Sequence, residues 1–209
     1  MTKAELAEKI KKFVPHGTET YVVDLLAQYK IQLKLNKPRS SKFGDYRSPG
    51  PDSKYHRITV NKDLNPYSFL ITFLHEVAHL TAFEKFKHTI DPHGKEWKSE
   101  FKVILQPVVK EHLLPDDILI AVKKYMHDPA ASSCSDAHLM KVLSKYDFDN
   151  KKLLEQIPLG ATFKLDSGRI FVKGKKLRSW YLCHELPSKK EYKVSGISKV
   201  EVIESIHPL

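Results

Sequence analysis

Cysteine is scarce in this chain. Only Cys134 and Cys183 occur among the 209 residues, and they lie far apart in the sequence. Two cysteines cannot build the disulfide framework of a small secreted domain or a four-cysteine zinc site. We therefore expect reduced thiols in a reducing compartment, and neither thiol belongs to a pattern that predicts a catalytic nucleophile.

Long uncharged apolar segments are also missing. The sequence contains no run of about 18 apolar residues, the length that a membrane-spanning helix needs. Residues 1–14 form a charged amphipathic pattern rather than the apolar core of a signal peptide. The sequence therefore predicts a cytoplasmic protein that does not associate with a membrane.

Acidic residues are outnumbered by basic ones. The chain holds 35 Lys and Arg against 25 Asp and Glu, and its formal net charge is +10. Residues 160–199 alone contain ten Lys or Arg and three carboxylates. An excess of positive charge in one region is typical of a protein with a polyanionic partner such as nucleic acid. The length suffices for one main domain and a small second one.

Apolar periodicity separates a helical part of the chain from a β-rich part. Alternation predicts two strands over 31–37 and 55–62, joined by a loop rich in Pro, Gly and Ser. Beyond residue 157, short alternating segments predict three to five antiparallel strands. Helical spacing and capping residues predict helices over 3–14, 21–30, 65–87, 95–109, 115–126 and 135–147. We therefore predict an α+β fold with a main domain over 1–156 and a small basic β-rich domain over 157–209.

The predicted helix over 65–87 carries the motif HEVAH. His75 and His79 are four residues apart, so they lie on one helical face and can present two imidazoles to one ion. Glu76 then stands beside the ion, which is the placement of a general base in a zinc metallopeptidase. A buried helix with two hydrogen-bonded histidines and no metal is the structural alternative. The apolar opposite face favours the metal site; it comprises Phe73, Val77 and Leu80.

A catalytic zinc site needs a third protein ligand and an open fourth position. His93 is the predicted ligand, because the segment DPHG reverses the chain after the helix and can return a side chain to the metal. Lys85 occupies the position six residues after His79 where a metzincin has its third histidine, so that pattern is excluded. Other candidates for the third ligand are His88, Glu96 and Glu100.

From about residue 20 to residue 110 the chain resembles the SprT-like, Spartan-related family of zinc metallopeptidases. The resemblance rests on the strand pair IQLKLNK and HRITVNK, on FLITFLHEVAHL and on HGKEWK. It implies a zincin-like domain in which His75, His79 and His93 bind one zinc ion and Glu76 is the catalytic acid and base. It further implies hydrolysis of protein substrates under the control of DNA.

The C-terminal region departs from the family pattern. Many SprT-like chains continue into a zinc ribbon with four cysteines, whereas this tail holds only Cys183. The tail therefore resembles a ribbon that lacks its cysteines. Its stability is expected to come from aromatic side chains packed on the main domain, namely Phe163, Phe171, Trp180, Tyr181 and Tyr192.

A basic turn in this tail is a candidate nucleic-acid site. Cationic side chains there can hold phosphates while an aromatic ring stacks on an unpaired base, which favours single-stranded over duplex DNA. A solvated turn whose aromatic residues face the core is the alternative. The candidate residues are Lys173, Lys175, Lys176, Arg178 and Trp180.

Together these features predict a zinc-dependent metalloendopeptidase, a hydrolase in which Glu76 activates water and DNA-bound proteins are substrates. An extended substrate is expected to pair with the strand over 55–60 at the edge of the sheet. One alternative is a non-catalytic, zinc-containing binding module associated with nucleic acid. Another is a zinc hydrolase that acts on a non-peptide bond.

Overall fold

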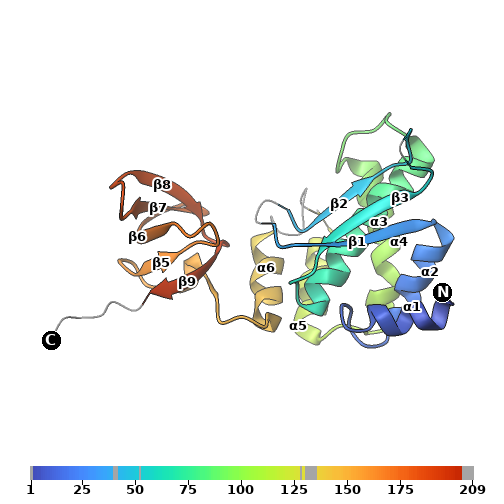
Figure 1. Cartoon of the computed structure of the whole chain (residues 1–209), viewed down its shortest axis with the longest axis horizontal. Coiled ribbons are helices and arrows are strands. Elements are labelled where there is room, and N and C mark those ends of the chain that lie inside the picture. Colours follow the sequence, from blue (N-terminus) through green and yellow to red (C-terminus); the bar gives the residue numbers. More distant parts are fainter. Residues whose placement is uncertain (1, 40–41, 52, 128, 130–135, 204–209) are drawn as a thin grey trace. The chain divides into compact units, whose positions relative to one another are not determined.

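The computed structural model describes residues 2–39, 42–51, 53–127, 129 and 136–203. The chain forms two compact units, Met1–Tyr146 and Asp147–Leu209. Helices and two sheets are both present (Figure 1), which confirms the predicted α+β class. The second unit begins before residue 157 because a short strand, β4 (Lys152–Leu153), already pairs with β9 (Lys199–Ile203), the last strand described.

The sheet of the first unit has three strands in the order β1-β3-β2. β1 (Ile31–Asn36) runs parallel to the central strand β3 (His56–Asn61), and β2 (Gly44–Arg47) runs antiparallel to it. β1 and β3 correspond to the two predicted strands. β2 lies in the segment that was expected to be a loop. A loop was expected there because the four residues GDYR show no apolar alternation.

Six α-helices accompany this sheet in the described part of the first unit. They agree with the predicted segments in number and order, although the first helix ends earlier than expected and Pro107 lies inside the fourth. A short 3₁₀ turn follows the sixth at Ser144–Tyr146. The helices are α1 (Lys3–Ile10), α2 (Glu19–Gln28), α3 (Pro66–Phe86), α4 (Lys95–Lys110), α5 (Asp116–Tyr125) and α6 (Ala137–Leu143).

Helix α3 is the centre of the first unit. Asn65 caps it by accepting a hydrogen bond from the backbone N–H of Ser68 (2.9 Å), and its amide donates to the carbonyl of Leu143 (3.0 Å). Pro66 occupies the first turn, where no helical N–H bond is lost. The helix is buried almost continuously from Ser68 to Ala82, between strands β2 and β3 and helix α4. A helix that is apolar on all sides belongs in a core, and α3 therefore holds its polar residues rigidly.

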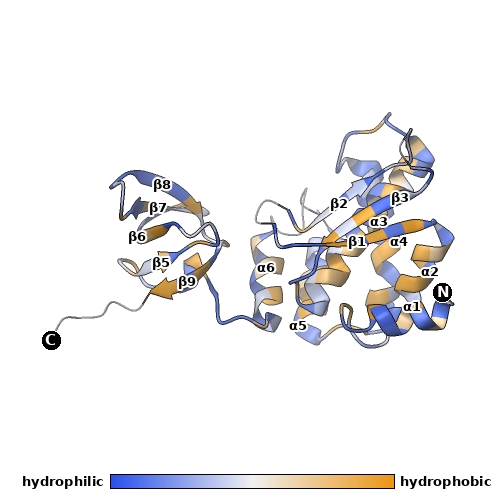
Figure 2. Cartoon of the chain, in the orientation of Figure 1, coloured by the Kyte–Doolittle hydropathy of each residue, from blue (hydrophilic) through white to orange (hydrophobic). Residues whose placement is uncertain are grey.

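The second unit is a six-stranded antiparallel sheet in the order β4-β9-β5-β6-β7-β8. The remaining strands are β5 (Thr162–Lys164), β6 (Ile170–Leu177), β7 (Trp180–Glu185) and β8 (Glu191–Ser195). A 3₁₀ turn at Leu154–Gln156 follows β4. Figure 2 shows that β8 is largely hydrophilic.

The predicted aromatic residues build a core within the second unit itself. The rings of Phe163 and Phe171 stack with centroids 5.7 Å apart, and Tyr181 and Cys183 belong to the same buried cluster. Tyr192 packs against this cluster, whereas the Trp180 side chain is 47% exposed. Trp180 therefore takes no part in the core of the second unit.

None of the helices among the described residues combines sufficient length with sufficient apolar character to cross a bilayer.

Candidate metal centre

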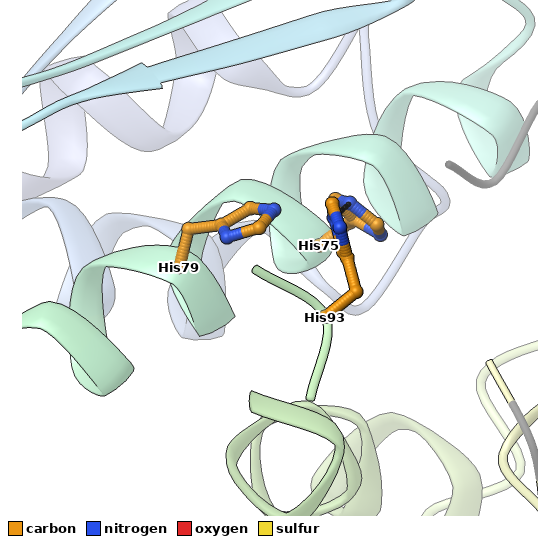
Figure 3. A group of neighbouring side chains, drawn as sticks. All are labelled: His75, His79 and His93. Atoms are coloured by element: carbon orange, nitrogen blue, oxygen red, sulfur yellow. Dashed lines mark hydrogen bonds between the residues drawn. The ribbon is translucent and has the colours of Figure 1, made fainter. Parts of the chain in front are cut away.

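Two of the three predicted ligands are fixed by α3. His75 and His79 are one helical turn apart and their ring centroids are separated by 5.1 Å. The two imidazoles project from the same side of the helix (Figure 3). Because α3 is capped and buried, the positions of both rings are set before any ligand binds.

The third imidazole is supplied by the turn between α3 and α4. Helix α3 ends at a backbone reversal in which Lys87 has a φ of 54°. His93 itself has a φ of 62°, an unusual value for a residue other than glycine. The N–H of Gly94, the residue before α4, donates a hydrogen bond to the Asp91 carbonyl (2.9 Å). This conformation turns His93 toward α3, where it faces the other two rings (Figure 3).

The three imidazoles lie close enough to share one cation. Nε2 of His93 is 3.3 Å from Nε2 of His75, and one ligand nitrogen from each of the three rings lies within 4.8 Å of the others. Two nitrogens bound to zinc at 2.0–2.1 Å in a tetrahedron are separated by about 3.3 Å. The separation of His75 and His93 therefore already matches that arrangement. Three imidazoles are also a donor set that suits zinc.

Burial keeps these histidines neutral. Desolvation, with smaller contributions from the neighbouring His79 and His93, lowers the pKa of His75 to about 2. Burial, followed by the effect of His93, lowers the pKa of His79 to about 4. The pKa of His93 is also lowered, first by burial and then by Lys98. Neutral imidazoles keep the lone pairs that a metal requires, so the site needs no proton release from these rings near neutral pH.

Glu76 stands beside the three nitrogens. Burial, and secondarily the carboxylate of Asp45, raises the pKa of Glu76 to about 8, against opposing effects of Lys42 and Arg39. The backbone N–H of Tyr46 also donates a hydrogen bond to the Glu76 carboxylate. A carboxylate that is buried, hydrogen-bonded and poised near neutrality is suited to accepting and returning a proton.

Strand β2 forms the opposite wall of the site. A methyl group at Gly44 would lie 2.6 Å from Oε1 of Glu76 and 2.7 Å from Cγ2 of Thr72, so only glycine allows this approach. The cavity between β2 and α3 has a volume of about 300 Å³, and both Glu76 and the three histidines line it. Sequence patterns missed this wall; the glycine at position 44 was its only local signal.

The other candidates for the third ligand lie elsewhere. The carboxylate of Glu100 accepts a hydrogen bond from Nζ of Lys85 (2.7 Å). The ring of His88 packs against Phe83 at 5.2 Å. Glu96 lies near Lys95, with 3.8 Å between carboxylate and ammonium. Among the described residues, the cluster of ligand atoms comprises His75, His79 and His93.

The strand expected at the edge of the sheet is in fact central. β3 has β1 on one side and β2 on the other, so residues 55–60 cannot accept an added strand. β2 is the edge strand that borders the cavity. The carbonyl of Phe43 accepts a hydrogen bond from the N–H of Asn61 in β3 (2.9 Å). The N–H of Tyr46 instead donates to the Glu76 carboxylate. The outer edge of β2 therefore runs past this carboxylate.

The structure divides the candidate nucleic-acid residues in two. Lys175, Lys176, Arg178 and Trp180 are exposed in and around the turn between β6 and β7. Lys173 is 4% exposed, and its ammonium group donates to the carbonyl of Ile157 (2.6 Å). The expectation that Lys173 contacts phosphate therefore conflicts with its position inside the second unit.

The one cysteine among the described residues does not belong to the site. Cys183 is a buried free thiol in the core of the second unit. Cys134 lies outside the described residues.

Fold and site together define an α+β protein in which three histidines, from one helix and the turn that follows it, are placed to hold a metal ion. A sequence profile of the SprT-like family matches residues 5–113, just over half of the chain, and the chain belongs to this family. The matched region contains Glu76 and the three histidines and ends before the second unit. No curated protein and no solved structure matched the chain.

Proposed function

We propose that the chain is a zinc-dependent metalloendopeptidase with a zincin-like catalytic domain. One observation carries the proposal: three neutral imidazoles converge on one point, and Glu76 lies in the same cavity without belonging to the ligand cluster. This separation of ligands from a carboxylate base is what hydrolysis at a zinc site requires. Membership of the SprT-like family supports a metallopeptidase-like domain.

His75, His79 and His93 would hold the ion. When bound, zinc lowers the pKa of a coordinated water and polarises the carbonyl of the scissile bond. Glu76 accepts the proton of the attacking water and delivers it to the leaving amine. The N–H of Tyr46 holds the carboxylate in place for both transfers.

The edge strand β2 gives the substrate its path. An extended peptide can pair with an exposed strand edge through main-chain hydrogen bonds alone. Because the edge of β2 passes Glu76, a peptide added there brings its own backbone to the base and the histidines. Main-chain recognition of this kind implies cleavage of unfolded or extended segments with modest side-chain preference.

DNA is the proposed regulator and carrier of the substrate. The exposed cations Lys175, Lys176 and Arg178 lie close in sequence to the exposed ring of Trp180. Such a set can hold phosphates and stack on an unpaired base, so single-stranded DNA is the proposed ligand and DNA-bound proteins are the proposed substrates.

The test is cleavage of a basic DNA-binding protein by the zinc-loaded chain, with and without single-stranded DNA. We expect cleavage that DNA stimulates, that Glu76→Gln abolishes, and that the double variant Lys176→Ala, Trp180→Ala makes independent of DNA. Cleavage that DNA does not change would overturn the regulatory role and leave the peptidase intact. Zinc binding with no cleavage of any polypeptide would instead favour the non-catalytic binding module.

A further inference from the structure

A second cavity opens beside the metal centre. It has a volume of about 580 Å³ and shares Tyr46, His79 and His93 with the cavity over Glu76. The two cavities are therefore continuous in their lining, and a substrate at the first reaches the second. The other apolar residues that line it include Ala82, Phe83, Ile90 and Trp97.

Tyr46 is a fixed wall of this second cavity. Its hydroxyl is 2.9 Å from Nδ1 of His56, and Nε2 of His56 is 3.5 Å from the Glu84 carboxylate. An Nε2–H directed at Glu84 leaves Nδ1 as the acceptor for the Tyr46 hydroxyl proton. The phenol hydroxyl is then engaged in the hydrogen bond with His56, so it is not a donor for substrate. The ring of Tyr46 faces the cavity as a surface for packing.

The floor of the cavity is aromatic. Phe83 packs against Tyr46 with ring centroids 6.3 Å apart, and Trp97 lies beneath His79 and His93 at centroid distances of 5.1 and 4.7 Å. Trp97 is 1% exposed and Ala82 is 3% exposed, so this floor is rigid and ends in a small side chain. Aromatic walls with a small residue between them suit one flat or branched apolar group.

The rim of the cavity carries two cations, each paired with a carboxylate. Arg47 lies 3.3 Å from Asp45 and Lys87 lies 3.5 Å from Glu84, and Asp91 is the acidic residue of the lining. Nζ of Lys87 lies 4.7 Å from the centre of the Phe83 ring, directly over the aromatic floor. A lysine or arginine side chain entering the cavity would meet these cations and would lose its hydration over an apolar surface.

The direction of β2 relates the cavity to the substrate. The strand begins at Gly44, next to Glu76, and ends at Arg47, at the second cavity. Antiparallel pairing is the more stable arrangement of two strands. A substrate that pairs antiparallel with β2 therefore places the segment before its cleaved bond at the Arg47 end.

We infer that the second cavity binds the substrate side chain on the amino-terminal side of the cleaved bond and selects large apolar groups over basic ones. This inference rests on the proposed peptidase function. It assigns selectivity to Phe83, Ile90 and Tyr46, which lie outside the metal ligands. The expected substrate residues at this position are Phe, Tyr, Leu and Met, and the disfavoured ones are Lys and Arg.

The first test maps cleavage sites in a peptide library by mass spectrometry. Ile90 is a partly exposed residue of the turn before α4 that packs against the edge of the core, so the urea denaturation of each Ile90 variant is measured alongside its cleavage profile. Ile90→Trp narrows the cavity and should lower kcat/KM for Phe relative to Ala at this position about ten-fold, the effect of a filled apolar pocket. Ile90→Ala should relax the preference. The control is Val103→Ala, an exposed residue of α4 outside the cavity.

The second test measures binding without turnover. Trp97 and Trp180 are the only tryptophans of the chain, so Trp180→Phe leaves Trp97 as the sole reporter. In zinc-loaded protein that also carries Glu76→Gln, a peptide with Phe before the target bond should change Trp97 fluorescence. The same peptide with Lys at this position should produce little change at equal concentration.

The outcomes separate the inference from the function on which it rests. If the unaltered protein cleaves peptides without preference, or with the preference after the cleaved bond, the assignment of this cavity is wrong while the peptidase stands. If Ile90→Trp and Val103→Ala have the same cleavage profile as the unaltered protein, the assignment is also wrong. If no peptide is cleaved and no peptide changes Trp97 fluorescence, both the peptidase and the cavity assignment fail.

Discussion

The close approach of β2 to the Glu76 carboxylate makes Gly44→Ala a demanding perturbation. The added methyl group would lie 2.6 Å from Oε1 and 2.9 Å from Cγ of Glu76, and 2.7 Å from Cγ2 of Thr72. Carbon atoms pack at about 3.5–4.0 Å, so β2 and Glu76 must separate by about 1 Å. A displacement of that size in a catalytic group costs on the order of 100-fold in rate. The same overpacking should cost about 1–3 kcal/mol of stability.

The assay compares kcat, bound zinc and urea denaturation for Gly44→Ala and a matched control. Gly50→Ala serves as the control, because a methyl group at Gly50 would meet nothing within 4 Å. We expect Gly44→Ala to bind zinc and lose about two orders of magnitude in kcat, while Gly50→Ala behaves as the unaltered protein. Adding Thr72→Ser removes one of the clashing atoms and should recover part of the loss in stability. Normal kcat in Gly44→Ala would refute the geometry of the site.

Three further predictions concern the metal, pH and the second unit. A zinc concentration 1,000 times the Kd should raise the free energy of unfolding by about 4 kcal/mol. His93→Ala should abolish most of this increase in a denaturation experiment. An unchanged increase in this variant would remove His93 from the ligand set. In chelator-treated protein the pKa of Glu76 is raised to about 8, so the folded state holds a proton that the unfolded chain has released. Stability should therefore fall as the pH rises from 7 to 8.5, and Glu76→Gln should remove this fall; a slope that persists in the variant would contradict the raised pKa. In the second unit, Lys173→Ala leaves a buried carbonyl without its donor and should cost about 1–3 kcal/mol, whereas the exposed Lys175→Ala should change the stability by no more than about 0.5 kcal/mol; equal effects would contradict the buried position of Lys173.

Much of the histidine cluster could be predicted because it depends on local sequence. Helical spacing fixes His75 and His79 on one face whatever the rest of the fold does. His93 required more, since its approach depends on a residue with positive φ in a turn. The reversal signalled by DPHG predicted that the chain turns, and tertiary packing determines which side chain of the turn reaches the helix.

The wall formed by β2 and the burial of Lys173 could not be predicted. GDYR has neither length nor apolar alternation, and it becomes a strand because β3 offers hydrogen-bonding partners. Lys173 belongs to a run of cations that is typical of a solvated turn. Side chains alternate between the two faces of β6, however, and this alternation turns Lys173 inward toward the carbonyl of Ile157. Both features depend on contacts between residues distant in sequence, which local patterns do not encode.

The central claim is that three histidines hold a zinc ion and that Glu76 supplies the proton transfers for peptide hydrolysis. The most direct measurement determines zinc content and cleavage of an unfolded polypeptide in the same samples of the unaltered protein and Glu76→Gln. The account predicts one zinc ion per chain in both and cleavage in the unaltered protein alone. Equal cleavage in both proteins, or loss of zinc from Glu76→Gln, would contradict it.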